Sequence, residues 1–569
     1  MASPRFPEPP PSMEPTPLAE VDALLERLHG QRDAWVQTPI PRRIQLLHEC
    51  VQASVAAAEG WVEAACRAKG IDAGSSRAGE EWLGGPVTTI RNMRLLIETL
   101  EKGGQPKPAN VERRADGQLV ARVFPGDLFD KLMFTGFTAD VWIEPGHEAT
   151  QGMIYRRKAA GETVEGKLAL VLGAGNVASI GPMDALYKLF AEDEVVILKT
   201  NPVNAYLGPF IEQSLRPLIE AGVFGVVHGG AEVGKHLTNH ELVETIHITG
   251  SDRTHDMIIW GSTPEEQAAN KAAGTPINTR PITSELGCVT PVLIVPGPWS
   301  EKQLDYQARH VAAMVTNNAS FNCNAAKVLV TAKGWPLRER FIEKVHAVLA
   351  GMPSRKAYYP GAQNRYQAFL EHYPNAKPLS VQGEEVVPWT VIPDVAPTSD
   401  EYALTNEAFC GVLAEVELDA TTAGEFLDAA TTFANDECWG TLSTMMLIHP
   451  KSEKEYADAF DRCVANLRYG GIGINVWAGV IYGLVVTTWG AHPGHPLEDI
   501  RSGRGVVHNT YMFEHPQKSV VKAPFVINPT PAWFSDHKTQ DKLGRALVRF
   551  EAKPGWGRLP AVIGAALRG

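Results

Sequence analysis

Residues 167–200 read KLALVLGAGNVASIGPMDALYKLFAEDEVVILKT, which gives an apolar strand, a glycine-containing turn, an amphipathic helix and a second apolar strand. The same alternation of strand and helix continues as far as TIHITGS at 245–251. Parallel strands need crossover connections of this kind, so the stretch predicts a doubly wound α/β domain. Ligands of such sheets bind at the carboxyl ends of the strands, which places a nucleotide site within 173–251.

The segments on either side of this stretch differ from it in pattern. Residues 19–104 space apolar residues three and four apart and predict helices. Residues 112–158 contain three strand-like runs, QLVARVF, ADVWIEP and GMIYRRK, with an insertion at 125–139. A second α/β region extends over 288–495. The proline-rich start predicts a disordered lead-in at 1–18.

One uncharged stretch of 21 residues, 470–490, is long enough in principle to cross a bilayer. It reads GGIGINVWAGVIYGLVVTTWG, and six of its residues are glycine. The words GIGINVW and YGLVVTTW favour two buried strands joined by a turn. We therefore expect no transmembrane span.

The composition of the 569 residues is typical of a folded globular protein and argues against several classes. Hydrophobic residues make up 44% and charged residues 21%, which excludes disorder of the whole chain. A formal net charge of −12 argues against nucleic acid as the main partner. Seven cysteines without a CxxC motif predict neither a disulfide framework nor a zinc ribbon. They indicate that the protein lies in a reducing compartment, and we expect this compartment to be the cytoplasm.

Two glycine motifs in the first α/β region suggest phosphate-binding loops. GAGNVA at 173–178 follows a strand with the spacing of a dinucleotide fingerprint. The next strand, however, ends in Lys199 rather than in the acid that this fingerprint uses for the ribose. Residues 229–235 have the spacing of a Walker A loop, yet His236 stands where Ser or Thr should ligate magnesium. Neither motif is specific by itself.

Six short words in one order extend across both α/β regions. They are ILKTNP at 197–202, ITGS at 248–251, SELGCVTP at 284–291, NNASFNCNAAKVLV at 317–330, NEAFCGV at 406–412 and GIGIN at 471–475. With these words the chain resembles a divergent member of the aldehyde dehydrogenase superfamily over about residues 20–525. The resemblance implies an α/β fold with a doubly wound nucleotide-binding domain, an α/β catalytic domain and a small bridging β-sheet.

The resemblance also divides the chain into segments. It implies an NAD(P)-binding domain at 19–111 and 159–287, a bridging and oligomerisation segment at 112–158 and 496–529, and a catalytic domain at 288–495. Bridging sheets of this family build homodimers or homotetramers, which we expect here. The tail at 530–569 is unmatched and strongly basic; the spacing of Leu543, Leu547 and Phe550 predicts a packed helix, with a subunit or membrane-surface contact as alternatives.

Three residues match catalytic positions of the family. Cys323 matches the nucleophile, whose thiolate would attack the aldehyde carbonyl and leave a thioester after hydride transfer. Asn176 matches the side-chain amide that stabilises the oxyanion. Glu285 matches the general base that activates water to hydrolyse the thioester. The resemblance therefore implies oxidation of an aldehyde to the acid.

The implied cofactor is NADP or NAD. The matching positions are Lys199, Gly230, Gly250, Ser251, Glu407 and Phe409. NAD-selective relatives often carry a Glu three residues after the lysine, where this chain has Pro202. Because loss of that acid removes a like-charge penalty against a 2′-phosphate, we expect NADP to be accepted, and the same loss allows a preference for NADP over NAD.

The chain also departs from the family pattern. Cys288 and Val289 replace the usual Gly and Lys after ELG, and residues 319–322 replace the usual Gly-Gln before the nucleophile. The word LGAGNVASIGP at 172–182 is similar to a loop of long-chain acyl-CoA reductases. The open alternatives are an acyl-CoA reductase or CoA-acylating aldehyde dehydrogenase, and a catalytically inactive dinucleotide-binding scaffold. Glu285, which the CoA-dependent branches commonly lack, favours oxidation to the acid.

Substrate and metal predictions rest on fewer residues. The family positions that line an aldehyde tunnel predict an apolar, aliphatic or aromatic aldehyde; they are Met183, Tyr187, Phe321 and Trp477. Two histidine pairs, His236 with His240 and His492 with His495, show no third ligand in the sequence. We expect no metal.

Overall fold

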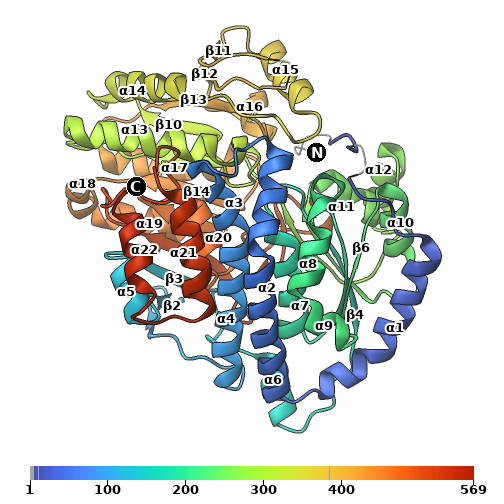
Figure 1. Ribbon diagram of the computed structural model, residues 1–569. Helices are drawn as coiled ribbons and strands as arrows, with labels where there is room; N and C mark the ends of the chain where they lie inside the picture. Colours follow the sequence, from blue (N-terminus) through green and yellow to red (C-terminus); the bar gives the residue numbers. More distant parts are fainter. Residues whose placement is uncertain (1–5, 10–11, 384) are drawn as a thin grey trace.

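The computed structural model describes residues 6–9, 12–383 and 385–569, and it is built on two large sheets (Figure 1). The predicted lead-in at 1–18 lies partly outside these residues. Helices α1 (Leu18–Gln37), α2 (Ile40–Lys69) and α4 (Thr88–Glu101) follow it, as the periodicity of 19–104 predicts. The apolar face of α2 packs on α4 and on α8 (Gly208–Ser214).

The first sheet is the doubly wound sheet that the sequence predicts. Its order is β17 (Gly503–Arg504), β8 (Ile282–Leu286), β7 (Thr245–Gly250), β4 (Leu168–Leu172), β5 (Val195–Lys199) and β6 (Phe224–Val227). All neighbours are parallel except β17, which pairs antiparallel with β8. Helices α7 (Ile180–Ala191) and α10 (Ala231–Asn239) are crossover helices of this sheet. The fold prediction is confirmed, and the carboxyl ends of its strands face one cleft.

The second sheet has eleven strands and joins the catalytic and bridging segments. In order they are β1 (Asn110–Arg113), β2 (Leu119–Phe124), β3 (Thr138–Ile143), β19 (Pro516–Lys522), β15 (Gly471–Ile474), β14 (Ser443–Leu447), β9 (Pro291–Ile294), β10 (Val328–Ala332), β13 (Val412–Leu418), β12 (Thr390–Val395) and β11 (Lys377–Pro378). The strand β19 pairs parallel with β15 and antiparallel with β3. The bridging strands β1–β3 therefore continue the catalytic sheet through β19.

Two predicted strands are wrong. The run GMIYRRK is the helix α6 (Met153–Ala159), which begins after Gly152 in a left-handed conformation. The run YGLVVTTW begins inside the helix α20 (Ala478–Leu484), and only Trp489–Gly490 of it pairs as β16. Residues 478, 481 and 484 are buried, so helical spacing gives α20 its apolar face. No helix among the described residues combines the length and apolar composition of a membrane span.

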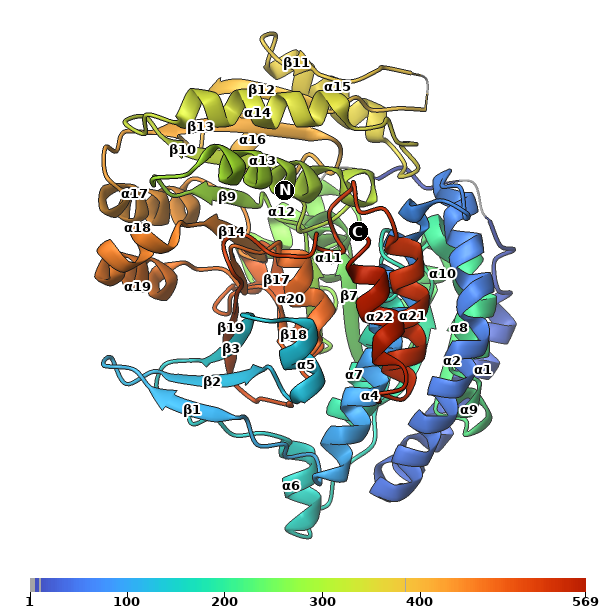
Figure 2. The same cartoon turned by 60° about the vertical axis from the view of Figure 1, so that its left-hand side comes forward.

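The C-terminal tail forms two helices that pack against the N-terminal ones (Figure 2). They are α21 (Gln540–Ala552) and α22 (Leu559–Ala566), and α21 contacts α4 and α3 (Gly79–Trp82). Glu551 of α21 is buried and pairs with Arg91 at 3.0 Å and Arg94 at 2.8 Å. The basic tail is thus a docked helical pair, as its apolar spacing predicts.

Candidate active site

Cys323 lies in the loop between α13 (Glu301–Thr316) and β10, at the amino end of β10 and facing the carboxyl ends of the strands of the first sheet. Three consecutive residues of this loop have positive φ angles: Asn318 at 50°, Ala319 at 55° and Ser320 at 68°. Non-glycine residues adopt this conformation at a cost of about 1–3 kcal/mol each, so surrounding contacts must hold it. Asn318 supplies them: its side chain donates to the carbonyl of Asn176 at 3.0 Å and accepts from Lys69 at 3.0 Å.

Glu285 comes from the end of β8 and faces the thiol of Cys323. Interactions with that thiol and with the indole of Trp489 act to lower the pKa of its carboxyl group. The side chain is buried, and its Oε1 has no hydrogen-bond partner among the described residues. Burial, with a smaller contribution from the nearby Asp184 carboxylate, raises the pKa of Glu285 to about 8. Such a group exchanges a proton near neutral pH, as a general base must.

The thiol of Cys323 is neutral in this environment. Burial raises its pKa well above the ordinary range, and the neighbouring Glu285 carboxylate raises it further. The ammonium of Lys327, which donates to the Cys323 carbonyl at 3.0 Å, opposes this shift. The thiol therefore needs a proton acceptor beside it to become a nucleophile, and the neighbouring carboxylate of Glu285 is the candidate.

Asn176 follows β4 and joins the nucleotide loop to the cysteine loop. Its Nδ2 donates to the carbonyl of Phe321 at 3.0 Å, two residues before Cys323. Its own carbonyl accepts from Lys69 at 3.0 Å and from the Tyr358 hydroxyl at 3.1 Å. These bonds fix the amide next to the thiol.

Steric crowding explains why a glycine, Gly175, precedes Asn176. A Cβ at Gly175 would lie 2.7 Å from both Asn201 Oδ1 and Val203 Cβ, closer than real side-chain contacts. The 3₁₀ turn Pro202–Leu207 after β5 occupies the space that a side chain would need. An aromatic residue therefore does not fit before Asn176 in this chain.

One cavity of about 820 Å³ at the strand ends brings together all nine predicted site residues. They are Asn176, Lys199, Gly230, Gly250, Ser251, Glu285, Cys323, Glu407 and Phe409. Lys199 ends β5 and is buried, and burial lowers its pKa to about 8. Glu407 is buried beside Gly287 and pairs with Lys327 at 3.2 Å. We call this the dinucleotide-side cavity.

The described part of the lead-in enters this cavity, which the sequence did not predict. Phe6 packs edge-to-face on Tyr359 and Phe409, with ring centroids 5.1 and 5.3 Å apart. The Glu8 carboxylate accepts from the backbone N–H of Ala231, at the start of α10, at 3.1 Å. A carboxylate thus lies where a helix N-terminus favours an anion.

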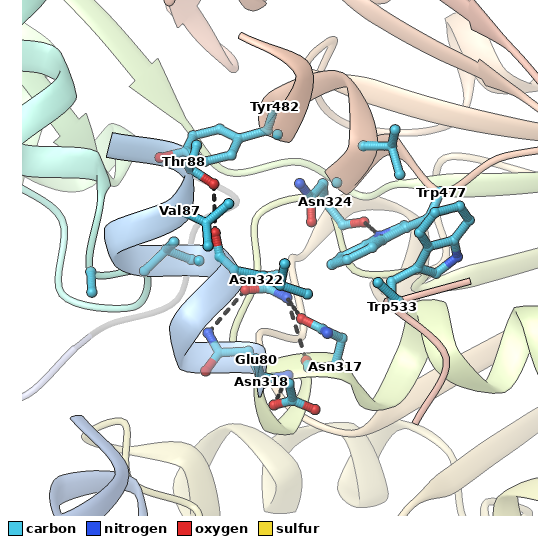
Figure 3. Close-up of a pocket in the computed structure, with 18 of the residues that line it drawn as sticks. Glu80, Val87, Thr88, Asn317, Asn318, Asn322, Asn324, Trp477, Tyr482 and Trp533 are labelled. Carbon is cyan, nitrogen blue, oxygen red and sulfur yellow. Dashed lines mark hydrogen bonds between the residues drawn. The ribbon is translucent and has the colours of Figure 1, made fainter. Parts of the chain in front are cut away.

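A second cavity, of about 240 Å³, adjoins the first at Cys323. Figure 3 shows residues that line this second cavity. The two cavities share Ile180, Glu285 and Cys323. The aromatic walls of the second cavity are Phe134, Trp477, Tyr482, Trp489 and Trp533. We call it the acyl-side cavity.

Only one of the four predicted tunnel residues lines this cavity. Trp477 does, and its indole donates to the Asn324 carbonyl at 3.0 Å. The prediction for Met183, Tyr187 and Phe321 is wrong, because their side chains pack into the protein core. Phe321 packs instead among the rings of Tyr358, Tyr359 and Phe409.

The histidine pair on α10 has an acidic neighbour that the sequence did not reveal. Asp22 of α1 accepts a hydrogen bond from His236 Nε2, and His240 Nε2 lies 3.5 Å from the same oxygen. The backbone N–H of Leu242 donates to His240 Nδ1 at 3.2 Å, which puts the proton of a neutral ring on Nε2. Hydrogen bonding between α1 and α10 therefore accounts for this group.

Comparisons with known proteins agree with this geometry. Residues 190–373 match the model of the aldehyde dehydrogenase family. The fold resembles many solved aldehyde dehydrogenase structures. Residues 190–373 are therefore similar to the aldehyde dehydrogenase family, and the fold of the described chain is that of aldehyde dehydrogenase structures. The predicted resemblance is thereby confirmed.

Three solved structures illustrate the distance to known members of the superfamily. Glyceraldehyde-3-phosphate dehydrogenase from Methanocaldococcus jannaschii, complexed with NADP, is 15% identical with a TM-score of 0.58, covering 90% of this chain and 96% of that one. Aldehyde dehydrogenase 21 from Physcomitrella patens, complexed with succinate, is 14% identical with a TM-score of 0.60, covering 90% and 92%. An aldehyde dehydrogenase from Mycobacterium tuberculosis, complexed with NAD⁺, is 15% identical with a TM-score of 0.58, covering 91% and 92%. At these identities the likeness shows the fold.

Proposed function

We propose that this chain oxidises an apolar aldehyde to the carboxylic acid, with NADP or NAD as hydride acceptor. The observation that carries the proposal is the position of Cys323 and Glu285. Both residues line both cavities, one suited to a dinucleotide and one to an acyl group, and they interact with one another at the junction. A nucleophile beside its base, open to both reactants, is the arrangement that this oxidation needs.

The residues of the dinucleotide-side cavity fit the proposed cofactor. The buried ammonium of Lys199 and the buried carboxylate of Glu407 lie in one cavity with Cys323 and can bind ribose hydroxyls. The Glu8 carboxylate already occupies the N-terminus of α10 and so stands in for an anionic group there. When bound, a nicotinamide dinucleotide would accept the hydride that leaves the aldehyde carbon.

In the first half of the reaction, Glu285 accepts the proton of Cys323. The thiolate then attacks the carbonyl carbon, and the carbonyl oxygen becomes an alkoxide. Asn176 Nδ2 can turn its hydrogen bond from the Phe321 carbonyl to this alkoxide. Collapse of the alkoxide expels hydride and leaves a thioester on Cys323.

In the second half, Glu285 acts on water. It first releases to solvent the proton that it took from Cys323; its carboxylate then takes a proton from a water molecule, and the resulting hydroxide attacks the thioester carbon. The carbon–sulfur bond breaks, the acid leaves, and Cys323 regains its proton. Atoms balance: one aldehyde and one water give one acid, one hydride and one proton.

An aldehyde panel tests the proposal. Hexanal and benzaldehyde are incubated with each cofactor, with and without coenzyme A, and the products are identified by mass spectrometry. We expect NAD(P)H and the free acid without coenzyme A. Turnover only with coenzyme A or acyl-CoA would support the CoA-dependent alternative, and absence of turnover under every condition would support the inactive scaffold.

The cofactor preference gives a separate prediction. Pro202 lines the cavity near Lys199 and carries no charge to repel a 2′-phosphate. We expect kcat/KM with NADP to equal or exceed that with NAD, and Pro202→Glu to lower the NADP value about tenfold through like-charge repulsion. The NAD value of the same variant is the control. A strong NAD preference of the unaltered protein would contradict the prediction.

The homodimer or homotetramer and the cytoplasmic location expected from the sequence remain predictions. The edge strand β1 supports the first, because all four of its residues are exposed and, among the residues that the structure describes, it pairs only with β2. An open edge of this kind is available to a second copy.

A further inference from the structure

The C-terminal segment supplies a wall of the acyl-side cavity. Its lining residues are Ala532, Trp533, Gln540, Leu547 and Glu551. This segment lies beyond the part of the chain that matches the family by its sequence words. The wall is therefore a feature of this chain, and its shape bears on which aldehyde the cavity accepts.

The wall is docked firmly against the N-terminal helices. A Cβ at Gly544 would lie 2.3 Å from the Cβ of Trp82, so α21 approaches α3 as closely as glycine permits. The guanidinium of Arg545 stacks over the Trp82 ring at 4.7 Å. The buried carboxylate of Glu551 binds Arg91 and Arg94. Segments fixed by such contacts act as a rigid surface rather than as a mobile cover.

The two cations of the cavity wall, and its carboxylates Glu80, Glu81 and Glu551, are paired with opposite charges. Lys69 pairs with Glu81 at 2.9 Å, Glu80 with Arg355 at 2.9 Å, and Arg91 with Glu551 at 3.0 Å. Neither cation of the wall, Lys69 or Arg91, is left to bind an anion. A carboxylate or phosphate on the substrate would enter a buried site without a counter-charge, which is costly.

The remaining surface of the acyl-side cavity is mainly apolar. Trp477 and Trp533 contribute indole rings and Val87 an aliphatic side chain (Figure 3). Val480 and Leu547 contribute further aliphatic side chains. Trp533 and Leu547 are only half-buried by the protein and pack beside the core clusters, so a ligand can cover what remains of them. Covering apolar surface stabilises a complex in proportion to the area removed from water.

We infer that the C-terminal segment is a specificity-determining wall that selects uncharged aldehydes with a medium-length alkyl or aryl group, through Trp533 and Leu547. The inference rests on the proposed oxidation and specifies its substrate class. It assigns a function to a tail that the family resemblance leaves without one.

Kinetics with a homologous series test the inference. The probes are ethanal, butanal, hexanal and octanal, with succinic semialdehyde as an anionic probe. We expect kcat/KM to rise up to about fourfold per methylene until the cavity is full. Trp533→Ala should lower the hexanal-to-ethanal ratio about tenfold or more, and Leu547→Trp should exclude hexanal while sparing ethanal. Succinic semialdehyde should be at least about a hundredfold poorer than butanal.

A matched control and a turnover-independent measurement complete the design. Trp556 lies on the same segment, is 62% exposed and lines neither cavity, so Trp556→Ala should leave the ratio unchanged. Hexanamide, which cannot be oxidised, should protect Cys323 from iodoacetamide in the unaltered protein and not in Leu547→Trp. Peptide mapping identifies the labelled cysteine, and melting temperatures show that each variant folds.

The outcomes separate the two proposals. If the folded variants Trp533→Ala and Leu547→Trp turn over aldehydes with an unchanged ratio of kcat/KM for hexanal and ethanal, the specificity wall is overturned. The proposed oxidation is then unaffected. A preference for succinic semialdehyde over butanal overturns the wall as well. A third outcome is that hexanamide protects Cys323 in the unaltered protein but not in Leu547→Trp, while no aldehyde is turned over. This outcome supports the specificity wall and overturns the proposed oxidation.

Discussion

Replacing Cys323 with serine is expected to abolish NAD(P)H formation from aldehydes, with a loss of about ten-thousandfold or more in kcat. Serine keeps the shape of the side chain but is a far weaker nucleophile beside a base whose pKa is only about 8. Cofactor binding should be unchanged, because the change removes no group that we place against the dinucleotide. Steady-state absorbance at 340 nm measures the first quantity, and isothermal titration with NADP measures the second.

Cys463→Ser is the matched control for this change. Cys463 is buried in α19 (Ala457–Asn466) and lines neither cavity. That variant should retain activity per folded molecule. Retained aldehyde oxidation by Cys323→Ser would remove the thiol from the mechanism, and equal losses in both variants would indicate damage to the fold.

Glu285→Gln is expected to lower steady-state turnover by about 10²–10⁴-fold and to change the form of its pH dependence. The amide is isosteric but takes no proton, so neither the thiol nor the hydrolytic water is activated. In the unaltered protein, burial raises the pKa of Glu285 to about 8, so the carboxylate is mostly protonated below that pH. Turnover should therefore rise as the pH increases through about 8, and the variant should lose this rise.

Rapid-quench kinetics distinguish the two roles of Glu285. If the variant still acylates, a burst of NAD(P)H should precede slow turnover, and mass spectrometry should detect the thioester on Cys323. The matched control is Glu415→Gln. Glu415 lies in β13, is similarly buried, binds His346 and lines neither cavity. The control variant should keep both the rate and the pH profile. A Glu285→Gln protein with the unaltered profile would exclude this residue as the base.

The sequence predicts the chemical centre better than its surroundings. Cys323, Glu285 and Asn176 belong to short contiguous motifs, each of which determines the local shape of the backbone. The order of strands and helices then brings these motifs together at one end of the sheets. All nine predicted residues consequently line one cavity. Their catalytic and binding roles remain predictions that the variants above test.

The features that the sequence did not reveal depend on contacts between distant segments. Trp533 and Leu547 reach the acyl-side cavity only because α21 docks on α3 and α4. Asp22 approaches His236 only because α1 packs beside α10. No local pattern encodes these pairings.

The wrong strand predictions and the wrong tunnel residues have a different cause. Residues 478–484 and 153–159 are short apolar or mixed runs, for which strand and helix periodicities are hard to separate. Met183 and Tyr187 lie on α7 close to the site, but their side chains turn into the core. The position of a residue in the sequence identifies the helix or strand on which it lies. It does not determine the direction in which the side chain points.

Phe6 and Glu8 give the dinucleotide-side cavity a competitor within the same chain. Any ligand that fills the cavity must first displace the ring contacts of Phe6 and the hydrogen bond between Glu8 and Ala231. Its apparent dissociation constant then equals the intrinsic constant divided by the fraction of molecules from which these residues have withdrawn. Affinity for that ligand is therefore a property of two coupled equilibria, and changes at the far N-terminus of the chain alter it without touching the ligand.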